Sequence, residues 1–202
     1  MLDAALRSDH LTADHDQRSR RGTPAERRAA KADIDDPAVV LEAALRFLEA
    51  RARSTSEVRR RLTAAGYRGE LVDGAIARLT ELGVLDDEEF ARAWVESRDR
   101  ARPRGERALR HELALKGIDK GVSDQVLEAR REAEEGTQVD LDGARRLRAR
   151  NARSLARVAD PRARRQRAYA LLARNGFDPD VCRQASVELI AGEPDHDEAG
   201  PD

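Results

Sequence analysis

The sequence predicts an all-α protein of three tandem three-helix repeats, which together form an elongated, curved, solenoid-like domain. The first observation behind this prediction is a short segment that has Leu four residues before a Gly and a bulky apolar residue directly after it. It occurs three times, at Leu62–Tyr67, Leu113–Ile118 and Leu172–Phe177. The second observation is composition, because charged residues make up 38% and aromatic residues 3% of the 202 residues. Such a composition is typical of a helical protein with a core of Leu, Val and Ala.

Each copy of this segment is predicted to form a helix, a glycine turn and a second helix. Apolar or small residues recur eight and four residues before each Gly and five and nine residues after it, which places them on one face of a helix. Gly66, Gly117 and Gly176 supply the left-handed conformation that ends the first helix of each pair. Three copies of such a unit in one chain indicate a repeat protein.

Two terminal segments are expected to be disordered. Residues 1–35 alternate Arg and Asp and show no apolar stripe, and residues 193–202 form an acidic C-terminal tail with Gly and Pro. Between these tails we expect a monomer of nine helices, from residue 37 to about residue 191.

The first repeat is assigned to residues 36–85. It begins at Asp36–Pro37, an N-cap residue followed by proline at the first helical position. Its second helix starts at a capping box formed by Ser54 and Glu57, and its third helix ends at Gly83.

The second repeat is assigned to residues 86–137. Asp86 is the predicted N-cap of its first helix, with further acids in the first turn, where the helix dipole favours them. Phe90 is the apolar anchor of that helix. The next helix carries Leu113 and ends at Gly117, and the last helix is expected to fray through residues 132–136.

The third repeat is assigned to residues 138–192. Its first helix is predicted from about residue 140 to about residue 158 and has the weakest apolar face of the chain. Asp160–Pro161 and Asp178–Pro179 are the predicted starts of the two remaining helices, which flank the turn at Gly176.

The chain offers little that could support an enzyme. It has no Gly-rich phosphate loop ending in Gly-Lys-Ser/Thr. His111 stands alone between charged residues, and the acids Asp86–Glu89 are explained by the helix start without a metal. Cys182 is the only cysteine and is expected to be a small core residue in a reduced, cytoplasmic protein. We therefore expect no catalytic residue, no cofactor, no metal site and no association with a membrane.

The distribution of arginine indicates binding. The formal net charge of the whole chain is −1, yet residues 138–191 hold 12 Arg and only 6 Asp and Glu. The helix after each glycine turn carries acids, which phosphates would repel, so these helices are poor candidates for reading DNA in the major groove. A solvated face is the alternative explanation for the basic residues. The candidate binding residues are Arg104, Arg107, Arg110, Arg162, Arg164 and Arg165.

The segment Leu82–Ala91 resembles the Leu-Gly-x-Leu-Asp-Asp-x-x-Phe-Ala signature of bacterial RecX regulatory proteins. Glu112–Leu113 and Lys116–Ile118 resemble a second run of that family, Glu-Leu followed by Lys-Gly-Ile. The resemblance covers about residues 38–191. The third repeat contributes its Gly-Phe turn and little more.

This resemblance implies three-helix repeats and a non-enzymatic regulator of DNA repair. Family members bind the RecA nucleoprotein filament and usually inhibit its ATPase and strand exchange, and some contact DNA. We therefore expect inhibition of the ATPase, recombinase and co-protease activities of RecA, in homologous recombination and the SOS response, with at most weak binding to single- or double-stranded DNA. The signature residues are expected to be structural: Gly66, Asp86, Asp87, Phe90, Gly117 and Gly176.

Two other classes of function remain open at this point. One is a helical DNA-binding protein that acts without RecA, which salt-dependent DNA binding in the absence of RecA would favour. The other is a scaffold for an unrelated protein, which failure to bind either filaments or DNA would favour.

Overall fold

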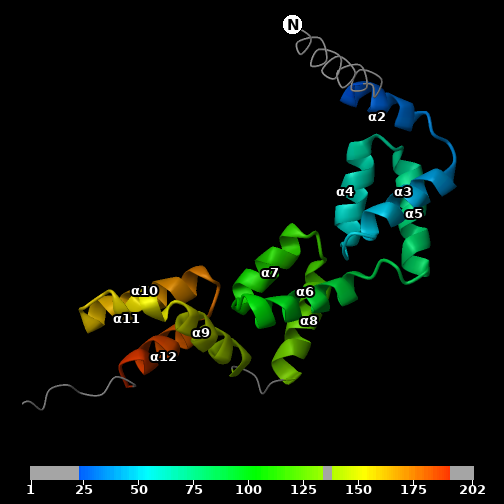
Figure 1. The fold of residues 1–202 in the computed structure, drawn as a ribbon. Helices are drawn as coiled ribbons and strands as arrows, with labels where there is room; N and C mark the ends of the chain where they lie inside the picture. The colour runs from blue at the N-terminus through cyan, green and yellow to red at the C-terminus, as the bar shows by residue number, and fades with distance from the viewer. Residues whose placement is uncertain (1–22, 134–137, 192–202) are drawn as a thin grey trace, which may run out of the picture. The chain divides into compact units, whose positions relative to one another are not determined.

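The computed structural model describes residues 23–133 and 138–191, and these ranges hold eleven α-helices and no strand (Figure 1). The prediction of an all-α fold is therefore confirmed. Within the described part of the chain, no helix is both long enough and apolar enough to cross a membrane. Helix contacts divide the chain into two compact units, residues 1–85 and residues 86–202.

The three glycine turns share one geometry. Each Gly has a positive φ, of 106°, 76° and 84° in chain order, which is the left-handed conformation that the repeated segment predicts. The residue after each Gly donates its backbone N–H to the carbonyl of the repeated Leu, over 3.3, 3.1 and 3.4 Å. That residue is also buried, and the three are Tyr67, Ile118 and Phe177.

The first unit contains four described helices: α2 (Pro24–Ala32), α3 (Pro37–Leu48), α4 (Thr55–Ala65) and α5 (Gly69–Glu81). The predicted starts of α3 and α4 are present. Asp36 accepts a hydrogen bond from the backbone N–H of Ala38 at 2.9 Å, and Ser54 and Glu57 cap each other's backbone. The core between α3, α4 and α5 includes Val40, Ala44, Val58, Leu62, Val72, Leu79 and Leu85.

Helix α2 lies in the segment that the sequence analysis assigns to a disordered tail, so that expectation is wrong for residues 24–32. The helix buries no side chain, which is why it leaves no apolar stripe in the sequence. Its N-terminus is fixed by a capping box between Thr23 and Glu26, with Pro24 at the first helical position. The other residues assigned to tails, 1–22 and 193–202, lie outside the described ranges.

Helix α2 packs against the first glycine turn. Arg28 Nε donates to the carbonyl oxygen of Ala64 at 3.1 Å, and the ammonium group of Lys31 lies 4.9 Å from the centre of the Tyr67 ring. A Cβ added to Gly66 would lie 2.6 Å from the carbonyl oxygen of Arg28. The turn therefore requires glycine both for its φ angle and for this close approach.

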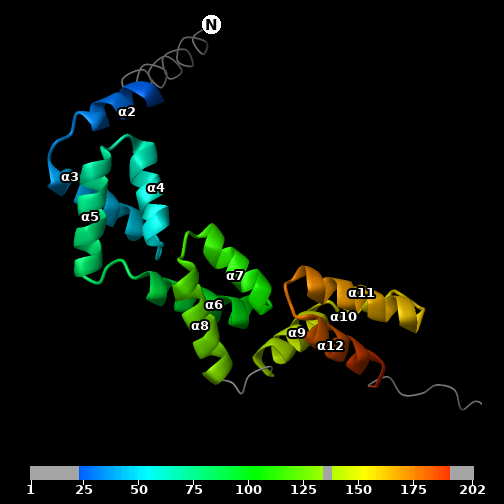
Figure 2. The same ribbon diagram turned by 180° about the vertical axis from the view of Figure 1, so that it is seen from behind.

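The second repeat forms the first part of the second unit, with α6 (Asp87–Ala101), α7 (Glu106–Leu115) and α8 (Lys120–Ala133). Asp86 caps α6 as predicted, because its Oδ1 accepts the backbone N–H of Glu88 at 2.8 Å and of Glu89 at 3.0 Å. Helix α8 packs against both α6 and α7 (Figure 2). The core includes Phe90, Ala91, Val95, Leu109, Leu113, Ile118, Val126 and Leu127.

The third repeat completes the second unit with α9 (Gln138–Arg150), α10 (Ala152–Ala156), α11 (Pro161–Arg174) and α12 (Pro179–Ala191). Asp160 caps α11, and Asp178 accepts the backbone N–H of Asp180 at 2.9 Å at the start of α12. Helices α11 and α12 lie side by side in both views (Figures 1 and 2). Their core with α9 includes Leu141, Ala144, Leu172, Phe177, Val181, Cys182 and Ala185.

The single helix predicted for residues 140–158 is wrong, because the chain breaks at Asn151. The Asn151 side chain donates to the carbonyl oxygen of Leu147 at 2.9 Å, and its backbone N–H bonds to Arg148, three residues back. Asparagine competes with the helix in this way wherever its amide reaches a nearby carbonyl. With α2, this break accounts for eleven described helices where nine are predicted.

Replacement of Asp86 by Ala should destabilise the second repeat by about 1 kcal/mol, since two N–H groups of α6 lose their acceptor. Trp94 is the only tryptophan and lies on α6, so urea unfolding followed by its fluorescence reports this repeat. Asp86→Asn keeps a capping oxygen and should stay within a few tenths of the parent. Equal losses for both variants would mean that the carboxylate charge matters instead of the cap.

Candidate interaction surface

The third repeat packs on the second through a close backbone contact. The backbone N–H of Gly105 donates to the carbonyl oxygen of Asn175 at 3.0 Å. A Cβ at Gly105 would overlap the carbonyl oxygen of Gly176 and the backbone of Phe177, and a Cβ at Gly176 would overlap Ala108. Both positions therefore require glycine, and the repeated turn of the third repeat also serves as a contact with the second.

Two of the candidate arginines lie at this contact. Arg104 bonds to the side-chain oxygen of Asn175 and has Nε 3.3 Å from Oε1 of Glu112. Arg107 Nη2 donates to the carbonyl oxygen of Ala173 at 3.0 Å, at the end of α11. Both side chains thus connect the second repeat to the turn of the third.

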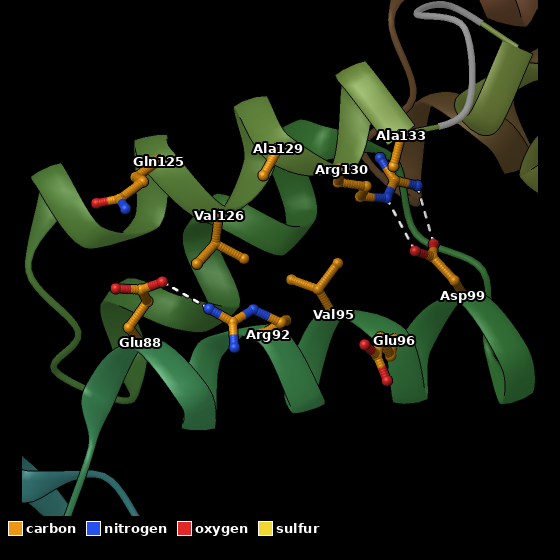
Figure 3. Close-up of a pocket in the computed structure, with 10 residues that line it drawn as sticks. All are labelled: Glu88, Arg92, Val95, Glu96, Asp99, Gln125, Val126, Ala129, Arg130 and Ala133. Carbon is orange, nitrogen blue, oxygen red and sulfur yellow. Dashed lines mark hydrogen bonds and ion pairs between the residues drawn. The ribbon is translucent and has the colours of Figure 1, made fainter.

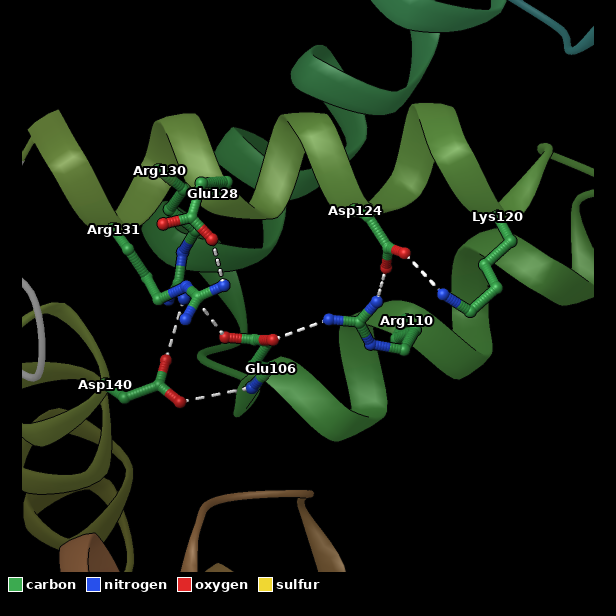
Figure 4. A network of polar contacts seen from close by, with 8 residues as sticks. All are labelled: Glu106, Arg110, Lys120, Asp124, Glu128, Arg130, Arg131 and Asp140. Atoms are coloured by element: carbon green, nitrogen blue, oxygen red, sulfur yellow. Dashed lines mark hydrogen bonds and ion pairs between the residues drawn. The ribbon is translucent and has the colours of Figure 1, made fainter.

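The third candidate of this group, Arg110, is also engaged. It pairs with Glu106 at 2.7 Å on its own helix and with Asp124 on α8 (Figure 4). Asp124 in turn pairs with Lys120 at 2.5 Å. The arginines proposed from the second repeat therefore all have partners inside this unit, and their replacement would disturb its packing as well as any external contact.

Arg130 is the centre of a second polar connection between the repeats (Figures 3 and 4). Its guanidinium makes two bonds of 2.9 Å to the carboxylate of Asp99 on α6 and one of 2.8 Å to Asp140 on α9. The other oxygen of Asp140 accepts the backbone N–H of Glu106 at 3.1 Å. Only 9% of the Arg130 side chain is exposed. Burial opposes its charge and is the largest single influence, but hydrogen bonds to Asp99 and Asp140 outweigh it and raise the pKa of Arg130.

Glu112 joins α6 to α7 in the same way. Its Oε2 accepts hydrogen bonds from Trp94 Nε1 at 3.0 Å and Arg98 Nε at 2.6 Å. The Arg98 guanidinium lies 4.0 Å from the centre of the Trp94 ring, and the Lys116 ammonium lies 4.7 Å from it. Trp94 is therefore held between two cations and a carboxylate, a structural arrangement within the second repeat.

A cavity of about 320 Å³ lies between α6 and α8 (Figure 3). Val95 and Val126 lie in its middle, and the ion pair of Glu88 with Arg92, at 2.6 Å, closes one end. The buried pair of Arg130 with Asp99 lies at the other end. Because these charged groups already satisfy one another, we assign the cavity no ligand.

Several arginines of the third repeat also have internal roles. Arg145 on α9 makes bonds of 2.6 and 3.0 Å to Glu188 on α12, and Arg148 lies 3.6 Å from the same carboxylate. The hydrogen bond from Arg145 is the largest influence on Glu188 and lowers its pKa. These pairs hold α9 against α12.

Arg150 and the candidate Arg164 bind backbone carbonyls. Arg150 donates to Ala101 at the end of α6, and so adds a further contact between the repeats. Arg164 Nε donates to the carbonyl oxygen of Val158 at 3.0 Å and Nη2 to that of Ala159 at 3.3 Å. Arg164 therefore fixes the segment between α10 and α11.

A set of arginines in the third repeat remains exposed and makes no side-chain hydrogen bond or ion pair with any described residue. Arg162 and Arg165 are the only two of the six candidates in this set, and both lie in the first half of α11. We call the set the arginine surface, and it consists of Arg146, Arg153, Arg157, Arg162, Arg165, Arg167 and Arg174.

Of the residues that join the second and third repeats, the sequence pointed to Arg104, Arg107 and Gly176, but as binding or turn residues and not as a contact between repeats. The position of Asn175 directly before the glycine of a turn was a usable signal. Asp99, Arg130 and Asp140 had no local signal, because their bonds join positions 10 and 31 residues apart.

The fold and these contacts define a helical protein of three-helix repeats whose second and third repeats are joined by polar side chains and glycine turns. Three family models match the chain in order. The first, second and third three-helix domains of RecX match residues 41–79, 86–127 and 138–185. The chain therefore belongs to the RecX family of regulatory proteins.

Individual relatives agree with this assignment. Regulatory protein RecX of Mycolicibacterium vanbaalenii is 34% identical over 158 residues, which cover 74% of this chain and 81% of the relative. The protein of the same name from Corynebacterium efficiens is 33% identical over 161 residues, covering 76% and 74%. The crystal structure of RecX from Lactobacillus salivarius has the same fold, with a TM-score of 0.67 at 20% identity, over 78% of this chain and 98% of that one.

Proposed function

We propose that this chain regulates RecA by binding the RecA nucleoprotein filament through the arginine surface of the third repeat, and that binding lowers the ATPase, recombinase and co-protease activities of RecA. The family assignment supports the regulatory role. The observation that carries the choice of surface is the set of exposed arginines that pair with no carboxylate of the described residues. The proposal requires no catalytic residue and no cofactor, and it requires the chain to share the cytoplasm with RecA.

An arginine surface suits a polyanionic partner. Guanidinium groups bind phosphates and carboxylates through paired hydrogen bonds, and they lose less hydration energy than ammonium groups when they do so. In the second repeat, by contrast, most arginines pair with an acid, as Arg110 and Arg130 do. The net charge of +6 over residues 138–191 is therefore concentrated on side chains that are free to meet a partner.

The second-repeat candidates take a different part in the proposal. Arg104 and Arg107 hold the third repeat in place. Their replacement would weaken binding indirectly, by loosening the repeat that presents the arginine surface, so they are unsuitable for testing direct contact.

The test replaces Arg162, Arg165 and Arg167 by Gln, which keeps helix propensity and removes three charges. With about 0.5 kcal/mol for each exposed contact, the affinity for RecA filaments on single-stranded DNA should fall about tenfold, and its dependence on salt should become weaker. Cosedimentation with filaments measures the affinity, and the RecA ATPase rate measures the regulatory effect.

A matched control removes the same charge from exposed arginines that already have partners: Arg46, Arg78 and Arg100. This triple variant should bind as the parent does. If the two triple variants lose affinity equally, net charge alone explains the effect and the arginine surface is not the contact. Salt-dependent binding to bare DNA with no filament binding would instead favour a DNA-binding protein that acts without RecA.

A further inference from the structure

A groove between α11 and α12 is not used by any contact described above. It has a volume of about 410 Å³ and is lined by Arg165, Gln166, Tyr169, Arg183, Ser186 and Val187. We call it the α11–α12 groove. Its floor is largely apolar, since Tyr169 packs on the core of the repeat and Val187 is 52% exposed.

Two polar side chains at this groove, Ser186 and Arg165, have no partner in the described part of the chain. Ser186 is 1% exposed, and its hydroxyl makes no hydrogen bond with any described residue. Because a buried hydroxyl without a partner is unfavourable, a group that bonds to it would be favoured. Among the described residues, Arg165 has no acidic partner, and Arg183 pairs with Asp180 alone, in an exposed pair of the kind that contributes little.

The chain itself supplies a complementary segment. Residues 193–202 contain five acidic residues and no Lys or Arg. The segment follows α12, which ends at Ala191, one turn after Val187 in the groove. Helix α11 runs beside α12, and Arg165 of α11 lines the groove. Arg162 lies about one turn before Arg165 on the same helix.

The lengths allow this contact. Eleven residues, from 192 to 202, span up to about 36 Å when extended. Helix α11 has 14 residues and is therefore about 21 Å long. Because the segment is attached to α12, its effective concentration at the groove is about 1 mM, so a contact with a dissociation constant near 1 mM would be half formed.

We propose that the acidic segment 193–202 binds back onto the α11–α12 groove and competes with an anionic partner for Arg162 and Arg165. The contact depends only on this chain, whereas its effect on filament binding rests on the proposed function. The segment would act as an internal competitor, so a higher concentration of the partner would be needed for binding.

The test uses the full chain with its five tail acids changed to amides: Glu193→Gln, Asp195→Asn, Asp197→Asn, Glu198→Gln and Asp202→Asn. Backbone amide resonances of Arg183, Ser186 and Val187 should shift between the parent and this variant at low salt. In 0.5 M NaCl the resonances of the parent should move toward those of the variant, because a Debye length of about 4 Å weakens exposed ion pairs. Identical groove resonances in both proteins would overturn the proposal.

Affinity supplies the second measurement. The amide variant should bind RecA filaments about fivefold more tightly than the parent, as expected when a few exposed ion pairs of competition are removed. In a background of Arg162→Gln and Arg165→Gln, the same tail changes should have no effect. A control that removes five exposed acids of the first unit should leave the groove resonances unchanged; its residues are Glu42, Glu49, Glu70, Asp73 and Glu81.

The two proposals can fail separately. Shifted groove resonances without filament binding by any variant would support the internal contact and overturn the proposed function. Filament binding that depends on Arg162 and Arg165, with unchanged groove resonances, would do the reverse. Shifts that grow with protein concentration would identify a second copy of the chain as the occupant and overturn the intramolecular contact.

Discussion

Replacement of Arg130 by Met should lower the free energy of unfolding of the second unit by about 3–5 kcal/mol. The guanidinium is nearly buried, and within the described ranges it is the one cation that pairs with both Asp99 and Asp140, whose side chains are 23% and 15% exposed. Without it, two carboxylates remain close together in a poorly solvated site, and their repulsion adds to the cost of their lost hydrogen bonds. Urea unfolding followed by the fluorescence of Trp94 gives the change.

The neighbouring residue provides the control. Arg131 has a side chain that is 45% exposed and pairs with Glu106 at 3.4 Å and with Glu128. Arg131→Met removes the same charge one position along α8 but should cost no more than about 1 kcal/mol. A variant that combines Arg130→Met with Asp99→Asn and Asp140→Asn should recover part of the loss, since it leaves no uncompensated charge. Equal costs for Arg130→Met and Arg131→Met would show that the buried site is open to water.

The parts of the fold that were predictable from sequence are those set by residues close together in the chain. Asp36, Ser54 and Asp160 each cap the helix that follows within three positions, and Gly66 adopts the positive φ that its turn demands. Such signals depend on local geometry alone. These signals recur because the helices of each three-helix repeat are capped and joined in the same way.

Helix α2 shows a limit of reasoning from apolar periodicity. The sequence of this helix contains a complete capping box at Thr23 and Glu26, but none of its side chains is buried. Its contacts are polar, through Arg28 and Lys31 to the turn at Gly66 and Tyr67. A helix held by caps and cations is invisible to a search for an apolar stripe.

The candidate site shows a second limit. Composition identified the third repeat as rich in arginine, yet it could not separate arginines with internal partners from free ones. Arg164 and Arg165 are adjacent, but the first binds carbonyls of the preceding segment and the second is exposed beside the α11–α12 groove. Bonds between distant positions, such as that of Arg104 with Asn175, decide which arginines have internal partners. Such bonds can be identified only from the tertiary structure.

Replacement of Gly105 by Ala should disrupt the packing of the third repeat on the second. The new Cβ would overlap the carbonyl oxygen of Gly176 and the backbone of Phe177, and backbone atoms cannot rotate away as a side chain can. Overpacking costs up to about 3 kcal/mol when neighbours cannot move, so we expect a loss near that value. The hydrogen bond from Gly105 to Asn175 would be strained at the same time.

Cys182 offers a local measurement of this loss. It is fully buried in the core of the third repeat, and burial raises the pKa of its thiol, so it should react slowly with a thiol reagent in the native chain. A loss of about 3 kcal/mol in Gly105→Ala should accelerate the reaction about a hundredfold. Gly74→Ala is the control, because a Cβ there meets nothing within 4 Å and alanine favours the helix. If Gly105→Ala reacts no faster than the parent, the third-repeat core is stable without its contact to the second, and the joining residues orient the arginine surface without stabilising the repeat that carries it.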